Sequence, residues 1–233
     1  MELNNYIKSS TKKDFEWSKS ALVSLARDLT LPKARHEEGL GERERIIENV
    51  LNLEACTDLL ESVPVRDWEQ SNSSEQRKLE GFSRMLTFNQ EFSEELWLKV
   101  HHAMKPIMDF AGSELADRFS HEHWRPLGFL PVFTLMRVQS GESVRGKVEE
   151  PDVEMRDRVS LMSLWIVLSQ SMDTFEIRTG KDQEGTVMKV RTGNGYLLEK
   201  LRSLYVPKVP EHQALVLLQT GVLFEKSALP KRP

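Results

Sequence analysis

Apolar residues recur at helical spacing in the first half of the chain. Between Lys13 and Leu29 they fall on one side of a helix, and Pro32 ends the pattern. Residues 46–63 contain two such groups separated by polar residues, which predicts two helical pieces. A third helix is predicted from Glu91 to Phe110. The first half is therefore expected to be mainly α-helical.

The apolar pattern shortens towards a period of two after residue 124. Pro126, Gly128 and Pro131 break a helix there, and short apolar runs typical of strands follow. Two long apolar runs are expected at the centre of a sheet because such strands are buried on both faces. Short strands at close spacing favour a β-sandwich or jelly roll, so the predicted fold class is α+β. The predicted strands are Val132–Val138, Val159–Leu168 with the apolar run Met162–Leu168, Thr174–Thr179, Thr186–Arg191, Gly195–Glu199, Ser203–Val206, and Ala214–Phe224 with the apolar run Leu215–Phe224.

Composition narrows the functional classes. Of the 233 residues, 39% are hydrophobic and 29% are charged, as in an ordinary globular protein. The formal net charge of −4 gives no overall positive charge that would favour nucleic-acid binding. The single cysteine, Cys56, excludes a disulfide framework and a cysteine-rich zinc site, which favours a reducing compartment and predicts the cytoplasm. No apolar run is long enough for a membrane span, so a soluble protein without a membrane partner is expected.

Three segments stand in a recognisable order along the chain: IIENVLNLEACTDLLESV, FSEELWLKVHHAMKPI and WRPLGFLP. They resemble the opening helix, the helix before the β-core and the W-x-P-x-G-L-N-P lead-in of the prolyl-4-hydroxylase-like branch of the Fe(II)/2-oxoglutarate oxygenases. The resemblance covers roughly the last four-fifths of the chain. It implies supporting N-terminal helices on a double-stranded β-helix (jelly-roll) core. The domain would span 41–226, with helices in 41–123 and the β-core in 124–226, after a helical extension at 1–40 and before a flexible tail at 227–233.

The family's first core strand leads into the pattern R-Y-x-x-G-x-x-F-x-x-H-x-D, whose His and Asp bind iron. The matching stretch begins at Arg137 and keeps this spacing without a gap. Lys147 stands at the His position, Glu149 at the Asp position and Val138 at the Tyr position. The resemblance therefore implies that the first two iron ligands are missing.

A later family strand, L-R-T-D-V-M-Y, resembles LQTGVLF near the end of this chain. The match places Gln219 at the Arg position that pairs with 2-oxoglutarate, and counting back places Tyr205 at the second iron-binding His. The sequence is thus similar to a degenerate member of the family, without its usual iron and co-substrate ligands.

These replacements change the chemistry of the site. A facial triad of two imidazoles and one carboxylate holds Fe(II) with open positions for its co-substrates. The ammonium of Lys147 would repel a divalent cation, and the neutral amide of Gln219 lacks the charge that pairs with a carboxylate. We expect no metal and no cofactor, with Lys147 and Glu149 forming an internal ion pair and Tyr205 filling the remaining volume. Fe(II) and 2-oxoglutarate are expected only if other residues bind them.

Other polar groups receive structural interpretations. His121–His123 and His36–Glu38 have the H-x-E type of spacing but lie outside the predicted β-core, in helical or loop positions, so surface or capping roles are favoured. His101 and His102 face different directions on a helix, His212 is expected in solvent, and Cys56 is expected to be a buried or half-buried helical thiol. The turn RTGNGYLL predicts a hairpin rather than a nucleotide loop. The charged loop Arg145–Arg158 fits a partner site and a solvated loop equally well.

Three functional hypotheses remain open. The first is a noncatalytic interaction or scaffold protein, a pseudoenzyme that binds a protein, or a small-molecule ligand, through its helical face or its former pocket. The second is an active 2-oxoglutarate-dependent dioxygenase, an oxidoreductase that hydroxylates a peptide or a small molecule with displaced metal ligands. The third is a nonoxidative enzyme with Lys147, Glu149 and Tyr205 as acid–base groups.

Overall fold

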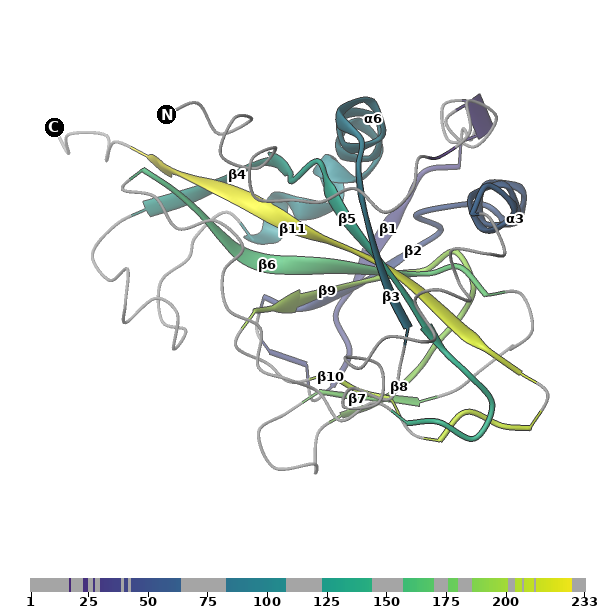
Figure 1. The fold of residues 1–233 in the computed structure, drawn as a ribbon. Helices are drawn as coiled ribbons and strands as arrows, with labels where there is room; N and C mark the ends of the chain where they lie inside the picture. The colour runs from purple at the N-terminus through teal and green to yellow at the C-terminus, as the bar shows by residue number, and fades with distance from the viewer. Residues whose placement is uncertain are drawn as a thin grey trace, which may run out of the picture.

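The described part of the chain includes two antiparallel sheets and the two α-helices α3 and α6 (Figure 1). The structure is a computed structural model of residues 1–233. The residues that it describes are 17, 23–24, 27, 30–38, 40–41, 43–63, 83–107, 123–143, 157–169, 176–179, 186–200, 204–206, 208–211 and 213–227.

The large sheet has eight strands in the order β1-β2-β9-β6-β11-β5-β3, and β4 pairs with one part of β11. Its centre is β11, which pairs with β6 on one side and with β5 and then β4 on the other. All of these pairs are antiparallel. The strands are β1 (Lys33–Arg35), β2 (Arg45–Glu48), β3 (Ser83–Phe88), β4 (His123–Phe129), β5 (Val132–Val138), β6 (Arg158–Val167), β9 (Gly195–Glu199) and β11 (Leu215–Ser227).

The small sheet has the order β10-β7-β8 and lies below the large sheet in Figure 1. Its strands are β7 (Glu176–Thr179), β8 (Thr186–Lys189) and β10 (Leu204–Tyr205). The chain runs from β6 in the large sheet to β7 and β8 in the small one, returns for β9, crosses again for β10 and returns for β11. This alternation between two sheets is typical of jelly rolls.

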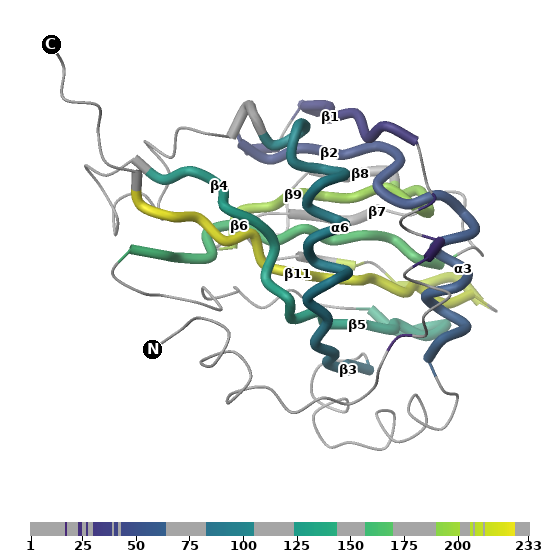
Figure 2. Tube along the Cα trace, turned by 90° about the horizontal axis from the view of Figure 1, so that it is seen from above, coloured from purple at the N-terminus to yellow at the C-terminus, as the bar shows by residue number. Residues whose placement is uncertain are grey.

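Helices α3 (Leu53–Glu61) and α6 (Gln90–Val100) lie on the face of the large sheet that is turned away from the small sheet (Figures 1 and 2). Each begins at an asparagine whose side chain accepts a backbone N–H: Asn52 from Ala55 at 2.8 Å and Asn89 from Phe92 at 2.9 Å. Such N-caps satisfy donors that a helix cannot pair internally. After α6 the chain tightens into a 3-10 helix, His101–Ile107.

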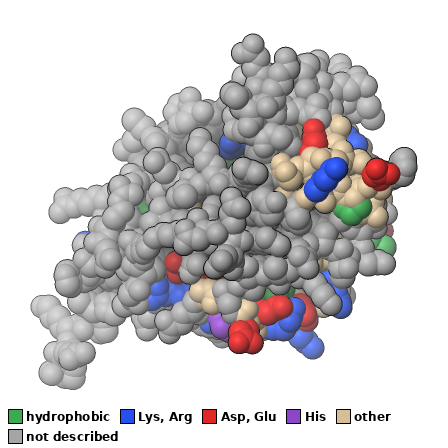
Figure 3. Space-filling model, turned by 90° about the horizontal axis from the view of Figure 1, so that it is seen from below, with side chains coloured by type: hydrophobic (Ala, Val, Ile, Leu, Met, Phe, Trp, Pro, Cys, Tyr) green, Lys and Arg blue, Asp and Glu red, His purple; other side chains and the backbone are tan. Residues whose placement is uncertain are grey.

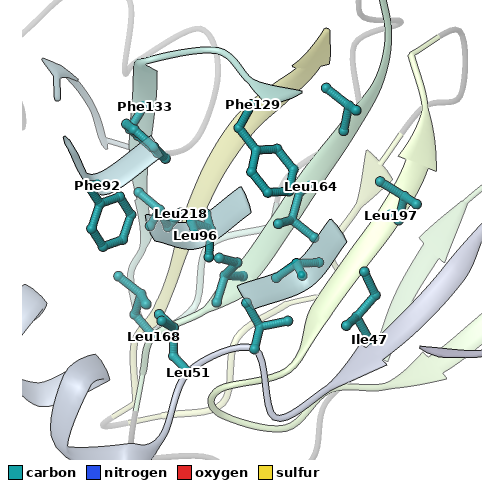
Figure 4. Close-up of a cluster of buried hydrophobic side chains, with 14 of the residues drawn as sticks. Ile47, Leu51, Phe92, Leu96, Phe129, Phe133, Leu164, Leu168, Leu197 and Leu218 are labelled. Atoms are coloured by element: carbon teal, nitrogen blue, oxygen red, sulfur yellow. The ribbon is translucent and has the colours of Figure 1, made fainter. Parts of the chain in front are cut away.

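Two hydrophobic clusters occupy the two faces of the large sheet. The helix-side cluster joins the sheet to α3 and α6, and Figure 4 shows its Phe92, Phe133, Leu96 and Leu218 packed together. The inner cluster lies between the sheets and includes Leu217. Since successive strand residues point to opposite faces, each central strand contributes to both clusters. The other members of the inner cluster are Leu40, Ile46, Met136, Val138, Trp165, Val167, Val190, Tyr196, Leu198, Val206, Val209 and Leu215.

The β-core predicted from the sequence agrees closely with the structure. β5 and β9 have the predicted bounds, and β6, β7, β8, β10 and β11 lie within three residues of theirs. The two apolar runs are central as expected: β6 is buried along nearly its whole length and lies between β9 and β11. The expectation of a second half rich in strands is confirmed, and the strands pair in antiparallel sheets.

The prediction of a mainly helical first half is wrong in its detail. The first helical piece of 46–63 is instead strand β2 and a turn, and β1, β3 and β4 were not predicted as strands. α6 confirms only the first part of the helix predicted from Glu91, and the helix predicted from Lys13 to Leu29 falls mostly outside the described residues. Within the described ranges, no helix combines the length and the apolar character needed to cross a membrane.

Candidate functional site

The inner face of the large sheet carries two of the described positions that correspond to the predicted pocket, Gln219 and Val138. On β11, Leu215 and Leu217 belong to the inner cluster, whereas Val216 and Leu218 belong to the helix-side cluster. Because side chains alternate along a strand, Gln219 points to the same inner face as Leu217. The position that the resemblance matches to the family's arginine therefore carries a neutral amide on the inner side of the central strand.

A row of paired residues crosses the inner face at the level of Gln219. Gln219 pairs with Thr134 on β5 and with Trp165 on β6, and Trp165 pairs in turn with Tyr196 on β9. Directly paired residues share one face of a sheet, so these four side chains lie next to one another. Gln219 is 9% exposed, Thr134 7% and Trp165 4%. The row offers hydrogen-bonding groups on an apolar wall, and no charged side chain.

The indole and the phenol in this row are both buried. Trp165 Nε1 donates to the hydroxyl of Ser163, two residues back on the same strand, at 3.1 Å. Burial raises the pKa of Tyr196 from 10.0 to about 12. A phenol with that pKa stays protonated at neutral pH, so it is a hydrogen-bonding group rather than a base.

The remaining predicted pocket residues are placed as follows. Val138, at the family's Tyr position, is fully buried in the inner cluster and pairs with Leu215. The backbone of Tyr205 belongs to β10 and pairs with Arg178 of β7, which puts it in the small sheet. Lys147 and Glu149 lie outside the described residues, so the ion pair expected between them stays a prediction.

Two histidines and the cysteine have structural contacts in the described part of the chain. His102 Nε2 lies 2.9 Å from the carbonyl of Pro32, and His101 Nδ1 lies 2.8 Å from the carbonyl of Leu98. Cys56 is fully buried in α3, which agrees with the predicted helical position and burial. Its Sγ lies 3.9 Å from the carbonyl of Val167. The described residues contain no group of three His, Cys, Asp or Glu side chains suited to a metal ion.

Two smaller predictions need correction. His123 was assigned to a helix or loop, but it begins strand β4; its neighbours His121 and Glu122, like His212, lie outside the described residues. His36 and Glu38 are exposed, which agrees with a surface role. The TGNG segment does form a turn, but it is not a hairpin because β8 and β9 belong to different sheets.

One buried charged group was missed by sequence reasoning. Glu44 is fully buried, and its carboxylate accepts the backbone N–H of Gly41 at 2.6 Å and that of Glu199 at 3.4 Å. Arg43 Nη1 lies 3.9 Å from the Glu199 carboxylate, and Lys200 is 1% exposed. These contacts tie the start of β2 to the end of β9. The charged run GERERIIE that leads into β2 gives no sign of this burial in the sequence.

Charges on the described surface are mixed. Seen from below, on the side of the small sheet, cationic and anionic side chains lie close together among the described residues (Figure 3). Neighbouring charges of opposite sign largely cancel at a distance and do not produce a strong steering field.

Comparison with known proteins gives structural neighbours but no family. No protein-family model matches the sequence, and no curated protein matches it. A prolyl-4-hydroxylase from Pseudomonas putida is similar in structure with a TM-score of 0.47 and 10% identity, covering 89% of this chain and 100% of that one. A viral collagen prolyl hydroxylase from Paramecium Bursaria Chlorella virus-1 has a TM-score of 0.45 and 12% identity, covering 79% and 97%.

A third neighbour is a prolyl hydroxylase from Trichoplax adhaerens, solved with a peptide of hypoxia inducible factor. Its TM-score is 0.44 at 12% identity, with 95% of this chain and 93% of that chain covered. At this level of similarity, none of the three likenesses assigns a family, a ligand or an activity to this chain.

Proposed function

We propose that this chain is a noncatalytic interaction or scaffold protein built on a double-stranded β-helix of the 2-oxoglutarate oxygenase type. The observation that carries the proposal is Gln219: it stands on the inner face of the central strand, where the resembled family has its co-substrate arginine. The proposed partner is a protein, with a small-molecule ligand as the other possibility, and the proposed compartment is the cytoplasm.

The row through Gln219 lacks the groups that would hold 2-oxoglutarate at the position the resemblance implies. A dicarboxylate buried in a protein needs cationic or multiple N–H partners to offset its desolvation. The row through Gln219 supplies an amide, and its paired neighbours Thr134 and Trp165 are uncharged. The next inward positions on β11 are Leu217 and Leu215, which cannot form hydrogen bonds through their side chains. Val138 likewise lacks the hydroxyl of the tyrosine found at its position in the resembled family.

The residue types at the iron positions also do not fit the metal of that family. Lys147 brings a positive charge to the place of a neutral imidazole, and Tyr205 brings a phenol to the place of the other. A single carboxylate, Glu149, makes a weak site for Fe(II). We propose that Lys147 and Glu149 pair with each other in place of the metal, which would neutralise both charges without any ion.

The decisive experiment measures Fe(II) and 2-oxoglutarate binding by the purified full chain under anaerobic conditions. Metal content is determined by elemental analysis after incubation with Fe(II), and 2-oxoglutarate binding by calorimetry, with an active prolyl hydroxylase as the positive reference. We expect neither ligand to bind this chain. Stoichiometric binding of both would overturn the proposal and support an active dioxygenase with unrecognised ligands.

A pair of variants makes the calorimetric result specific to the proposed position. Gln219→Leu removes the hydrogen-bonding groups at this site, and the exposed-residue variant Leu98→Ala serves as a control with an unchanged inner face. If 2-oxoglutarate binds the wild-type chain and the control but not Gln219→Leu, then Gln219 is a ligand residue and the site is not degenerate. If neither the wild-type chain nor either variant binds 2-oxoglutarate, then the wild-type chain already lacks a site for it.

A further inference from the structure

Trp165 has the largest side chain in the row that crosses the inner face. It is 4% exposed, belongs to the inner cluster, and stands on β6, which lies between β9 and β11. It pairs directly with Gln219 of β11 and with Tyr196 of β9. The Cβ atoms of directly paired residues lie about 5 Å apart, so the indole begins beside the amide of Gln219.

A hydrogen bond fixes the direction in which the indole of Trp165 extends. Its Nε1 donates to the hydroxyl of Ser163, which lies 3.1 Å away and two residues back on the same strand. Two residues of a strand span about 7 Å, so the ring system runs along β6 from the level of Gln219 to the level of Ser163. The hydrogen bond at the far end of the side chain favours one orientation of the ring.

The residues level with Ser163 leave room for this ring. Ser163 pairs with Gly221 of β11, which has no side chain, and with Leu198 of β9, which belongs to the inner cluster. Ser163 is 1% exposed and Gly221 is buried. Small residues beside a large one are typical of complementary core packing. The indole of Trp165 therefore covers the inner face next to Gln219 and Gly221.

We propose that the indole of Trp165 is the built-in occupant of the space beside Gln219, where the resembled family has its co-substrate arginine. An indole side chain and 2-oxoglutarate have a similar number of non-hydrogen atoms. With Gln219 9% and Thr134 7% exposed, the wall at this level offers little accessible surface to a ligand. Trp165 thus closes the inner face to small molecules, and the protein partner binds outside it. This inference rests on the proposed function and narrows it to a protein partner.

The first test empties the space and offers the missing group back. Trp165→Ala removes the indole ring, and free indole is the probe; circular dichroism and a cooperative melting curve establish that the variant is folded. By calorimetry we expect indole to bind this variant with a Kd of about 1 mM or tighter. At about ten times its Kd, indole should raise the melting temperature by about 4 °C. The wild-type chain should show neither effect.

A second probe reports how the ring is held. 1-Methylindole lacks the N–H group that would donate to Ser163, so it should bind Trp165→Ala about five-fold more weakly than indole does. Equal affinities would show that the probe does not take the orientation of the native indole.

The location of the space is tested by a double-mutant cycle that needs no ligand. Gln219→Phe adds a ring beside Trp165, and overpacking should lower the melting temperature of the wild-type chain by about 5 °C. In the Trp165→Ala background the same ring has room and should raise the melting temperature by about 3 °C. Trp97→Ala is the control background, because Trp97 packs against the helix-side cluster on the other face. There Gln219→Phe should destabilise as it does in the wild-type chain.

Three results would overturn the proposal: indole binding by the wild-type chain as tight as by the variant, no indole binding by folded Trp165→Ala, or an equal effect of Gln219→Phe in both backgrounds. None of them bears on whether the chain binds Fe(II) and 2-oxoglutarate, which tests the proposed function separately. If Trp165→Ala does not fold, Trp165→Val leaves a smaller space, and benzene replaces indole under the same criteria.

Discussion

Replacing Gly193 with alanine is predicted to destabilise the fold strongly because the backbone of another segment lies against it. Gly193 has φ +81, a conformation that residues with a Cβ adopt at a cost. A Cβ built there would lie 2.2 Å from the carbonyl oxygen of Leu51. No side-chain rotation relieves that overlap, since the atom it meets belongs to the main chain.

The expected loss can be estimated from the hydrogen bonds that hold the turn. Leu51 donates to the carbonyl of Gly193 at 3.0 Å, Gly193 to that of Val167 at 2.8 Å, and Val167 to that of Asn194 at 3.1 Å. Moving the turn far enough to admit a methyl group breaks or lengthens these three bonds, at about 1 kcal/mol each. The left-handed backbone adds about 1 kcal/mol. Gly193→Ala should therefore lower the free energy of unfolding by about 4 kcal/mol.

Gly141 supplies a matched control. It has the same φ of +81, but a Cβ there would have the end of the Lys208 side chain, at 3.7 Å, as its nearest neighbour. Gly141→Ala should cost about 1 kcal/mol, because it incurs the backbone term without the overlap. Urea unfolding followed by circular dichroism and tryptophan fluorescence measures both variants. Equal destabilisation of the two, within about 0.5 kcal/mol, would refute the reasoning from the Leu51 contact.

Three further predictions concern single side chains. The unfolded chain releases the Tyr196 proton near pH 10 and the folded chain only near its raised pKa of about 12, so the free energy of unfolding should fall across this range by up to about 3 kcal/mol. Tyr196→Phe should remove that part of the slope in denaturant titrations at successive pH values, and an unchanged slope would contradict the burial argument. Asn89→Ala should cost about 1 kcal/mol in urea unfolding, because the N-cap bond to Phe92 is lost, and no change would show that the cap is dispensable. Arg125→Gln should change the same quantity by about 0.5 kcal/mol or less, since its ion pair with Glu225 on the surface is screened by water, and a loss above about 1.5 kcal/mol would show a stronger pair.

The β-core was predictable because its strands are marked locally. Val132–Val138 follows Pro131, and Gly195–Glu199 follows the turn at Gly193. Both contain apolar residues at strand spacing, and their predicted bounds agree with the structure. The central strands β6 and β11 were recognisable from continuous apolar runs, since a strand buried on both faces cannot alternate with polar residues. In these regions local pattern and long-range packing agree.

Strand β2 was missed because its local pattern and its long-range partner disagree. Ile46 and Ile47 stand beside charged residues in an order that also suits an amphipathic helix. In the structure one isoleucine faces each hydrophobic cluster, as in a strand, and β2 pairs with β9, which lies far along the sequence. That pairing cannot be read from a window of neighbouring residues. The same limit explains the TGNG turn, whose flanking strands belong to different sheets.

The candidate site was predictable only in part. The position of Gln219 on a central strand followed from the apolar run around it, but its inward direction required the register of β11 against β5 and β6. The buried charges of Glu44 and Lys200 gave no sequence signal, because burial of a charged residue depends on distant contacts. The expected pairing of Lys147 with Glu149 and the role of Tyr205 stay predictions.

The position of β11 has a consequence for the assembly of the molecule. Among the strands that the structure describes, β11 is the last along the chain, yet it fills the gap between β6 and β5, and it also pairs with β4. Until β11 is in place, β6 presents an open apolar edge on that side, the kind of edge that recruits strands from other molecules. A ribosome-bound chain that ends before Leu215 would therefore hold two halves of a sheet without the strand that joins them, and would be a natural client of chaperones.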